Sequence, residues 1–247
     1  MTHKTKGIVL RITKYGETSI IASIFTELFG IQTYLINGVR KLQKTNKSIM
    51  LQPSAILDLE VYHHDIKNIQ RIKEYNWSFV YTDLLTDVIK NSIVTYMMEL
   101  LHKTLKQPES NPSLFYFCED VLLELDKAAA DNIANFPLYF ALQLPQFFGL
   151  SIQLPEKISF ESDTLYVDLR EGLFTNQKPI HMEFIEGDAA NYFREVLKIM
   201  HPSELNQVKL NKETRRLLLT KMHQYYQLHI SEFGSMKTMK ILQEVLT

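Results

Sequence analysis

Lys6–Thr13, with the sequence KGIVLRIT, is the first of five short runs in which apolar and polar residues alternate. Within it, Ile8, Leu10 and Ile12 share one side, as the two-residue period of a β-strand requires. The remaining runs are Ser19–Phe25, Ile31–Val39, Ala55–Tyr62 and Ile69–Trp77. Five short strands separated by turn residues favour a closed barrel, and the five-stranded OB-fold fits this pattern best.

A basic segment, NGVRKLQKTNK at residues 37–47, separates the third run from the fourth and contains no acidic residue. Each of its four cations could neutralise one phosphate, so log K for single strands would fall with log salt at a slope of about −3. The alternative is a solvated loop that only maintains solubility. We favour nucleic-acid binding by Arg40, Lys41, Lys44 and Lys47.

The fifth run combines cations with aromatic rings. The alternation places Arg71, Lys73, Tyr75 and Trp77 on one face. Bases can stack on such rings while the cations contact phosphates, which adds Arg71 and Lys73 to the expected DNA-binding residues. In the competing interpretation the two rings face the junction with the next domain, and for Trp77 this interpretation is preferred.

The charge of the chain is uneven. Residues 1–80 contain eleven Lys or Arg and six Asp or Glu, a net charge of +5, whereas the rest carries −6. Arg11 and Lys14 contribute to the positive charge at the end of the first run. This asymmetry suggests two domains with different partners.

Helical periodicity begins after Phe79, which predicts an α+β protein with a barrel domain at 1–80 and a helical domain at 81–247. Asn111-Pro112 and Gly149 are a typical helix start and end, and Pro145 should kink or shorten the helix that Gly149 ends. An insertion at 150–185 could contain a hairpin. The expected helices are 82–106, one from 112, 137–148, 188–200, 211–230 and 236–246, and the hairpin strands are Lys157–Glu161 and Thr164–Asp168.

Enzyme signatures are missing from the sequence: it has no phosphate-binding glycine loop and no His-Glu-x-x-His. His63-His64-Asp65 is the most plausible catalytic cluster, but a polar turn is the better interpretation. The spacing of His223 and His229 argues against a shared metal, and Cys118 falls on an apolar helical stripe. We therefore expect no catalytic residue, cofactor or metal. With neither a signal-like start nor an apolar run of membrane length, we expect a cytoplasmic protein.

Several segments resemble the RecO family of bacterial recombination mediators. Matches in the later part of the chain lie at Phe147-Phe148-Gly149, Asp168–Gly172 and Glu232–Leu242, so the resemblance covers nearly the whole chain. The strongest matches are Thr5–Arg11, Tyr15–Ser19, Phe25–Gly30, Asn37–Lys41 and Leu51-Gln52-Pro53.

The resemblance implies an OB-fold followed by a helical domain, binding of single- and double-stranded DNA, and annealing of complementary strands at the nucleoid. Its implied partners are RecR, RecF, single-stranded-DNA-binding protein and RecA. Carried onto this chain, the DNA contacts fall on Arg11, Arg40, Lys41, Lys44 and Lys47. Some members hold a four-cysteine zinc element after Phe-Gly, but this chain has no cysteine between 150 and 185.

The resemblance also implies a pocket for the acidic, Phe-ending tail of single-stranded-DNA-binding protein. The sequence offers only Arg215 and Arg216 as candidates for it. Two alternatives stay open at this point. One is a general OB-fold protein that binds single-stranded DNA or RNA without repair partners, and the other is a protein-interaction scaffold.

Overall fold

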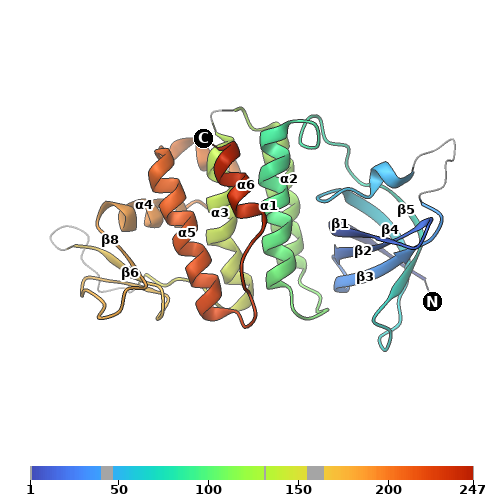
Figure 1. The fold of residues 1–247 in the computed structure, drawn as a ribbon, viewed down its shortest axis with the longest axis horizontal. Coiled ribbons are helices and arrows are strands. Elements are labelled where there is room, and N and C mark those ends of the chain that lie inside the picture. Colours follow the sequence, from blue (N-terminus) through green and yellow to red (C-terminus); the bar gives the residue numbers. More distant parts are fainter. Residues whose placement is uncertain (1, 40–46, 131, 155–163, 247) are drawn as a thin grey trace. The chain divides into compact units, whose positions relative to one another are not determined.

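A computed structural model describes residues 2–39, 47–130, 132–154 and 164–246 of the chain (Figure 1). The chain divides into two compact units, Met1–Asp126 and Lys127–Thr247. The first unit contains a barrel and two helices, and the second contains further helices and a small sheet. The sequence places a domain boundary at residue 80, between the barrel and the helical domain, and this boundary stays a prediction.

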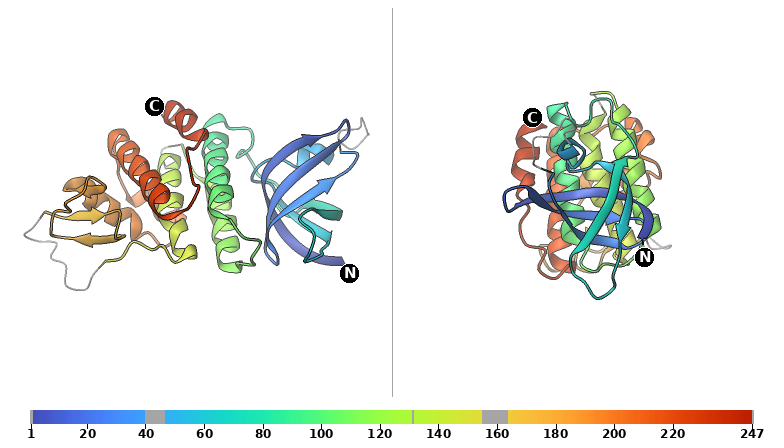
Figure 2. Two further views of the ribbon diagram at one scale, coloured as in Figure 1. Left: turned by 60° about the horizontal axis from the view of Figure 1, so that its bottom comes forward. Right: turned by 90° about the vertical axis from the view of Figure 1, so that its right-hand side faces the viewer.

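Five strands form the barrel, with the closed order β1-β2-β3-β5-β4 (Figure 2). Its neighbouring strands are antiparallel except β3 and β5, which run parallel. This arrangement confirms the predicted five-stranded OB-fold, in which closure leaves no long exposed edge. The strands are β1 (Thr2–Tyr15), β2 (Ser19–Thr26), β3 (Gly30–Ile36), β4 (Ile56–Tyr62) and β5 (Gln70–Trp77).

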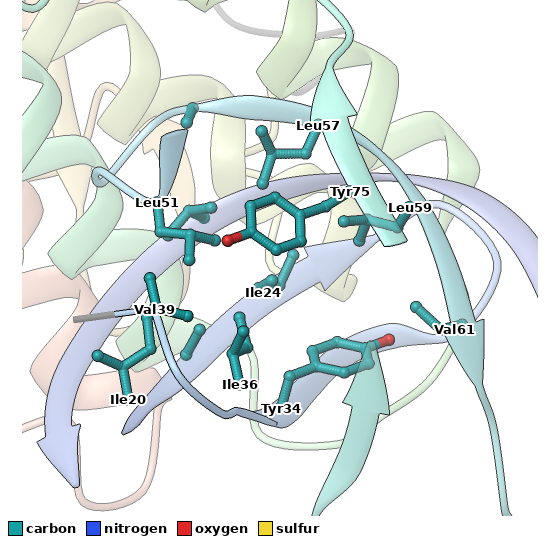
Figure 3. Packing of buried hydrophobic residues seen from close by; sticks show 13 residues of the cluster. Ile20, Ile24, Tyr34, Ile36, Val39, Leu51, Leu57, Leu59, Val61 and Tyr75 are labelled. Atoms are coloured by element: carbon teal, nitrogen blue, oxygen red, sulfur yellow. The ribbon is translucent and has the colours of Figure 1, made fainter. Parts of the chain in front are cut away.

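The interior of the barrel is filled by apolar side chains from all five strands (Figure 3). Tyr34 and Tyr75 are the large rings of this cluster, and Leu51 and Val39 come from the segments beside the short helix η1 (Lys47–Met50). Burying an aliphatic or aromatic side chain of this size stabilises a fold by roughly 1.5–3 kcal/mol. The alternating residues of the sequence therefore supply the barrel core.

Two β-bulges alter which side chains share a face. In β1, Val9 pairs with Ile24 and Arg11 with Ser23, so Leu10 is the extra residue. In β5, Glu74 pairs with Glu60 and Ile72 with Val61, which leaves Lys73 as the extra residue. Residues separated by an even number of positions normally share a face of a strand. A bulge between them shifts the alternation by one residue, so they no longer do.

Two helices complete the first unit: α1 (Val88–Thr104) and α2 (Pro112–Lys127). The Asn111 side chain accepts a hydrogen bond from the Leu114 N–H at 3.0 Å, which confirms the predicted start of α2. α1 begins later than expected, because Asp87 caps it by accepting from the N–H groups of Ile89 and Lys90. On α2, Phe115 contacts Phe25 of β2, with ring centroids 5.7 Å apart.

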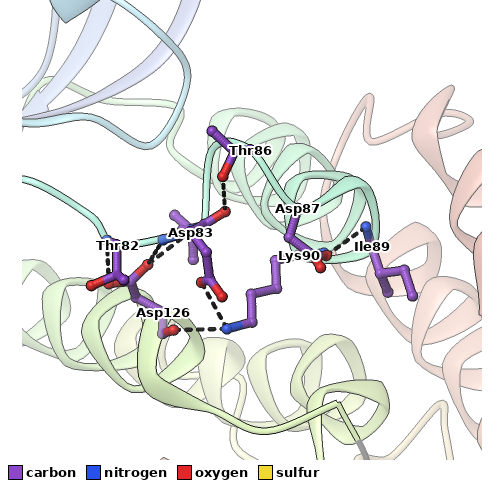
Figure 4. A network of polar contacts seen from close by, with 8 residues as sticks. Thr82, Asp83, Thr86, Asp87, Ile89, Lys90 and Asp126 are labelled. Carbon is purple, nitrogen blue, oxygen red and sulfur yellow. Dashed lines mark hydrogen bonds and ion pairs between the residues drawn. The ribbon is translucent and has the colours of Figure 1, made fainter.

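A buried polar network fixes the segment before α1 to the end of α2 (Figure 4). The Asp126 carboxylate accepts hydrogen bonds from the N–H groups of Thr82, Asp83 and Leu84 at 2.9–3.1 Å. The Lys90 ammonium, with a residue exposure of 5%, donates to the Asp83 carboxylate at 2.9 Å and to the Asp126 carbonyl at 2.7 Å. We call Asp83, Lys90 and Asp126 the polar hub.

The second unit is built around α3 (Phe136–Gln143), all of whose residues are buried. As predicted, Pro145 shortens the α-helix: the chain continues as η3 (Leu144–Phe148) and ends at Gly149, whose φ is +70°. The expected later helices are also present. The remaining helical elements are η2 (Ile133–Asn135), α4 (Asp188–Leu197), η4 (Pro202–Gln207), α5 (Lys212–His229) and α6 (Thr238–Val245).

A three-stranded sheet occupies the described part of the insertion. Its central strand β6 (Tyr166–Asp168) pairs on one side with β7 (Leu173–Thr175) and on the other with β8 (Phe184–Glu186). Both edges of β6 are therefore occupied, which leaves none for the hairpin partner expected from the sequence. That partner, Lys157–Glu161, lies outside the described residues.

Candidate nucleic-acid interface

The basic loop expected to bind nucleic acid is largely outside the described part of the chain. Arg40, Lys41 and Lys44 belong to the undescribed residues 40–46. Lys47 begins the η1 turn, but only its backbone is described. The role of these four residues stays a prediction from the sequence.

Arg11 and Lys14 are exposed on β1, as a phosphate contact requires. Arg11 pairs with Ser23 and Lys14 with Ile20 in the register of β1 and β2. Neither side chain forms a hydrogen bond or an ion pair among the described residues. Their charges are therefore available to a ligand, but they do not lie beside one another on the strand.

The expectation that β5 presents cations and aromatic rings on one face is wrong. Arg71 and Lys73 are exposed, whereas Tyr75 is 7% exposed and Trp77 packs partly buried against the same barrel core. The bulge at Lys73 is the reason, because it moves Tyr75 to the inner face. Lys73 also binds the Glu60 carboxylate at 2.7 Å, and this hydrogen bond raises the pKa of Lys73.

A groove in the first unit carries several of the unpaired cations. Its first part, about 470 Å³, is lined by β2, β3, the β4–β5 loop and the end of α1. Its second part, about 790 Å³, shares His64, Lys67 and Gln70 with the first and continues along β5 to Arg71. We call this continuous surface the barrel groove. Its charged or imidazole side chains are His63, His64, Asp65, Lys67, Arg71, His102 and Lys106.

The barrel groove also contains an exposed aromatic ring. Tyr62, at the end of β4, is 40% exposed and pairs directly across from Arg71. A ring beside a guanidinium is the combination that holds a base by stacking while a phosphate is neutralised. The stacking position expected at Tyr75 is therefore available at Tyr62, on the neighbouring strand.

The His63-His64-Asp65 cluster is part of a turn between β4 and β5, which supports the polar-turn interpretation over a catalytic one. His63 stacks on the Phe29 ring at 3.9 Å, and its Nε2 lies 3.2 Å from Asp65. The His63 Nδ1 atom is buried and has no hydrogen-bond partner among the described residues. The imidazole thus helps to shape the groove wall.

His102 lines the barrel groove, although no pattern in the sequence indicated a binding role for it. Burial lowers its pKa, and the cations Arg11, Lys103 and Lys106 lower it further, while Glu99 acts in the opposite direction. Arg11 comes from β1, so the influence of Arg11 reaches the last turn of α1 through space. No sequence signal could show this, because only folding brings residues 11 and 102 near enough for the charge of Arg11 to act on His102.

Arg215 and Arg216, the candidates for partner binding, line a narrow pocket of about 40 Å³ in the second unit. Its other walls are mostly apolar and come from α3, α5 and α6, with Leu138, Leu219 and Leu242 among them. Arg215 donates to the Leu210 carbonyl at 2.8 Å, and burial lowers its pKa. Arg216 is exposed at the same site. The pocket therefore joins apolar walls to positive charge.

No group of three or more potential metal ligands exists among the described residues. Within residues 150–185, Asp168 accepts from the N–H groups of Arg170 and Glu171 and lies 3.1 Å from His181 Nε2. These residues include no thiolate, so they do not fit a four-cysteine zinc site. Cys118 is fully buried on α2, as expected for core packing. No described helix has the length and apolar character needed to cross a membrane.

Comparison with known proteins gives matches along almost the whole chain. The N-terminal model for recombination protein O matches residues 1–81, and the C-terminal model matches residues 85–238. The DNA repair protein RecO of Bacteroides fragilis is 29% identical over 246 residues, with 99% of both chains covered. The RecO proteins of Azobacteroides pseudotrichonymphae and Flavobacterium psychrophilum are each 30% identical, the latter over the full length of both chains.

Proposed function

The chain belongs to the RecO family of non-enzymatic recombination mediators, and on this premise we propose that it binds single- and double-stranded DNA. Bound to DNA, it anneals complementary strands and assists the loading of RecA onto strands covered by single-stranded-DNA-binding protein. The barrel groove, with unpaired cations beside an exposed tyrosine, is the observation that carries the DNA-binding part.

Annealing by such a surface needs no nucleotide. Two DNA strands repel one another through their phosphates, and a positively charged protein surface screens this repulsion and raises the local strand concentration. The positive net charge of residues 1–80 supports this mechanism. The four cations of the basic segment at residues 37–47 are part of this positive charge.

We infer that the partners are RecR, RecF, single-stranded-DNA-binding protein and RecA, as the family resemblance implies. The pocket beside Arg215 and Arg216 suits the acidic, Phe-ending tail of single-stranded-DNA-binding protein. Its apolar walls would contact the phenylalanine ring once the pocket widens to admit it, and the guanidinium groups would bind the terminal carboxylate. We also propose that the protein acts in the cytoplasm, at the nucleoid.

A titration of labelled single-stranded DNA at several salt concentrations tests the DNA-binding proposal. Replacing Arg40, Lys41, Lys44 and Lys47 together by alanine should flatten the salt slope by about 3, because each lost phosphate contact removes roughly 0.7. The same variant should anneal complementary strands more slowly. A salt slope identical to that of the unchanged protein would exclude the loop as a phosphate-binding element.

A second titration separates a mediator from a general single-strand-binding protein. Anisotropy with a fluorescent acidic peptide ending in Phe should show saturable binding, and Arg216→Ala should weaken it. Arg216 is the better target because Arg215 also holds the Leu210 carbonyl. Lys198→Ala, at the end of α4 in the same unit, provides the control. Strong DNA binding without any peptide binding would favour the general single-strand-binding alternative.

A further inference from the structure

The end of α1 is part of the barrel groove although it lies outside the barrel. Ser23, Gln32 and Thr33 of β2 and β3 line one side, and the β4–β5 loop lines another. His102 and Lys106 complete the lining from the last turn of α1 and the residues after it. A strand lying in the groove would therefore contact helix α1 as well as the barrel.

The charges around His102 are strongly one-sided. Arg11 acts from β1, and Lys103 and Lys106 act from the end of α1 itself, whereas the Glu99 carboxylate acts in the opposite direction. The β4–β5 loop contributes Lys67, Asp65, His63 and His64 to the same groove, and the lining residues from β2 and β3 carry no charge. Excess positive charge in a groove attracts a polyanion.

We propose that single-stranded DNA bound in the barrel groove contacts the end of α1, and that binding there adds a proton to His102. This inference rests on the proposed DNA-binding function and deepens it, by assigning α1 to the binding surface and by making affinity depend on pH. The group that titrates is a histidine, which can change its charge in the physiological range.

The direction of the effect follows from the neighbours. In the free protein, burial and the surrounding cations lower the pKa of His102, so its imidazole is neutral at neutral pH. Phosphates in the groove would offset those cations, and the pKa of His102 would rise. DNA binding should then take up a proton, and by linkage the affinity should increase as pH falls from about 7.5 toward 6.

The test is an anisotropy titration of a labelled oligothymidylate of about 20 nucleotides at fixed ionic strength, at pH 6.0, 6.5, 7.0, 7.5 and 8.0. One linked proton changes affinity by at most about tenfold per pH unit, so we expect a several-fold gain between pH 7.5 and 6.0. His102→Gln should reduce this gain to less than about twofold.

Two further measurements test the inference, and a third controls for folding. Calorimetry in buffers of different ionisation enthalpy should show net proton uptake by the unchanged protein and less by His102→Gln. Lys106→Ala, at an exposed position, should flatten the salt slope by about 0.7, whereas Lys198→Ala in the second unit should not. Circular dichroism confirms that each variant is folded.

The outcomes distinguish this inference from the proposed function. Absence of DNA binding by the unchanged protein would contradict the proposed function itself. DNA binding with no pH dependence, or with the same dependence in His102→Gln, would overturn the inference alone. So would a loss of the pH dependence in His64→Gln but not in His102→Gln, because the proton would then enter at the β4–β5 loop.

Discussion

A lysine lies near each end of helix α1, and the two lysines have opposite environments. In its first turn, Lys90 is buried, and its ammonium donates to Asp83 and to the Asp126 carbonyl. After its last turn, Lys106 is exposed and has no hydrogen bond or ion pair among the described residues. One helix thus has a buried, hydrogen-bonded cation at one end and an exposed, unpaired cation just beyond the other.

This difference separates stability from binding. A buried charge must be paired and hydrogen-bonded, because an uncompensated charge in the interior costs several kcal/mol. An exposed cation contributes little to stability, but its interaction with a polyanion remains available. Substitutions in the polar hub should therefore affect folding, and substitutions in the barrel groove should affect DNA affinity.

The largest effect is expected from Asp126→Ala. It leaves the N–H groups of Thr82, Asp83 and Leu84 without their buried acceptor, so the free energy of unfolding should fall by about 3 kcal/mol. Urea denaturation followed by circular dichroism measures this. Asp120→Ala, at an exposed position of the same helix, should change the free energy by less than about 0.5 kcal/mol. Equal effects of the two substitutions would contradict the role given to the polar hub.

The stabilisation that the polar hub gives to the protein should also decrease in acid. Burial alone would raise the pKa of Asp126, but hydrogen bonds from the Thr82, Leu84 and Asp83 N–H groups hold it below its ordinary value. The unfolded carboxyl has a pKa of about 4. The stabilisation is therefore present above that pH and is lost as pH falls through the lower folded pKa. Asp126→Asn should make the stability less dependent on pH between about 5 and 2.

A smaller loss of stability is expected at Gly30, where the β2–β3 turn meets the segment between α1 and α2. Its φ is +63°, and an added Cβ would lie 2.1 Å from the Glu109 carbonyl oxygen. Gly30→Ala should cost about 2 kcal/mol in thermal or urea unfolding, because backbone strain and overlap add. Gly16→Ala has a similar φ and open space around it, so it measures the strain alone. A cost at Gly30 no greater than at Gly16 would show that the Glu109 contact relaxes freely.

Two tyrosines on neighbouring strands sharpen the comparison further. Tyr62→Ala should weaken single-stranded DNA binding by about 1–2 kcal/mol through lost stacking, with little change in unfolding free energy. Tyr75→Ala should instead destabilise the protein, because its ring fills the barrel core. Anisotropy and denaturation of both variants provide the test. A Tyr62→Ala protein that binds DNA normally would remove Tyr62 from the binding surface.

The smallest effect concerns the two cations of β5. Arg71→Ala should reduce the salt slope of DNA binding by about 0.7, because Arg71 has no counter-ion among the described residues. Lys73→Ala should change it less, since Lys73 is already bound to Glu60 at 2.7 Å. Salt titrations of the two single variants compare them directly. A larger change for Lys73 would mean that DNA displaces Glu60 from its partner.

Local pattern predicted the elements of this fold well, because strand alternation and helix caps depend on residues close in the chain. The five barrel strands, the Asn111 cap and the end at Gly149 are all confirmed. The bulge at Lys73 was not predictable, since it depends on how β5 pairs with β4. The alternation therefore gave the wrong face for Tyr75.

The barrel groove was only partly visible in the sequence. Arg71 stands out as a cation on a strand, but His102 and Lys106 belong to a segment whose apolar stripe indicates only a helix. Their role depends on α1 lying beside β2, β3 and the β4–β5 loop. The same limit explains the early predicted start of α1, because Asp126 of α2 holds residues 82–84 in a turn before it.

Because Cys118 is buried, its reaction with a thiol reagent can be used to measure opening motions of the protein. It is the only thiol among 247 residues, it is fully buried on α2, and burial raises its pKa. A thiol reagent can modify it only when the first unit opens far enough to expose α2. The rate of labelling thus measures the population of open molecules without any introduced probe. Slower labelling in the presence of DNA would show how strongly the ligand stabilises this unit.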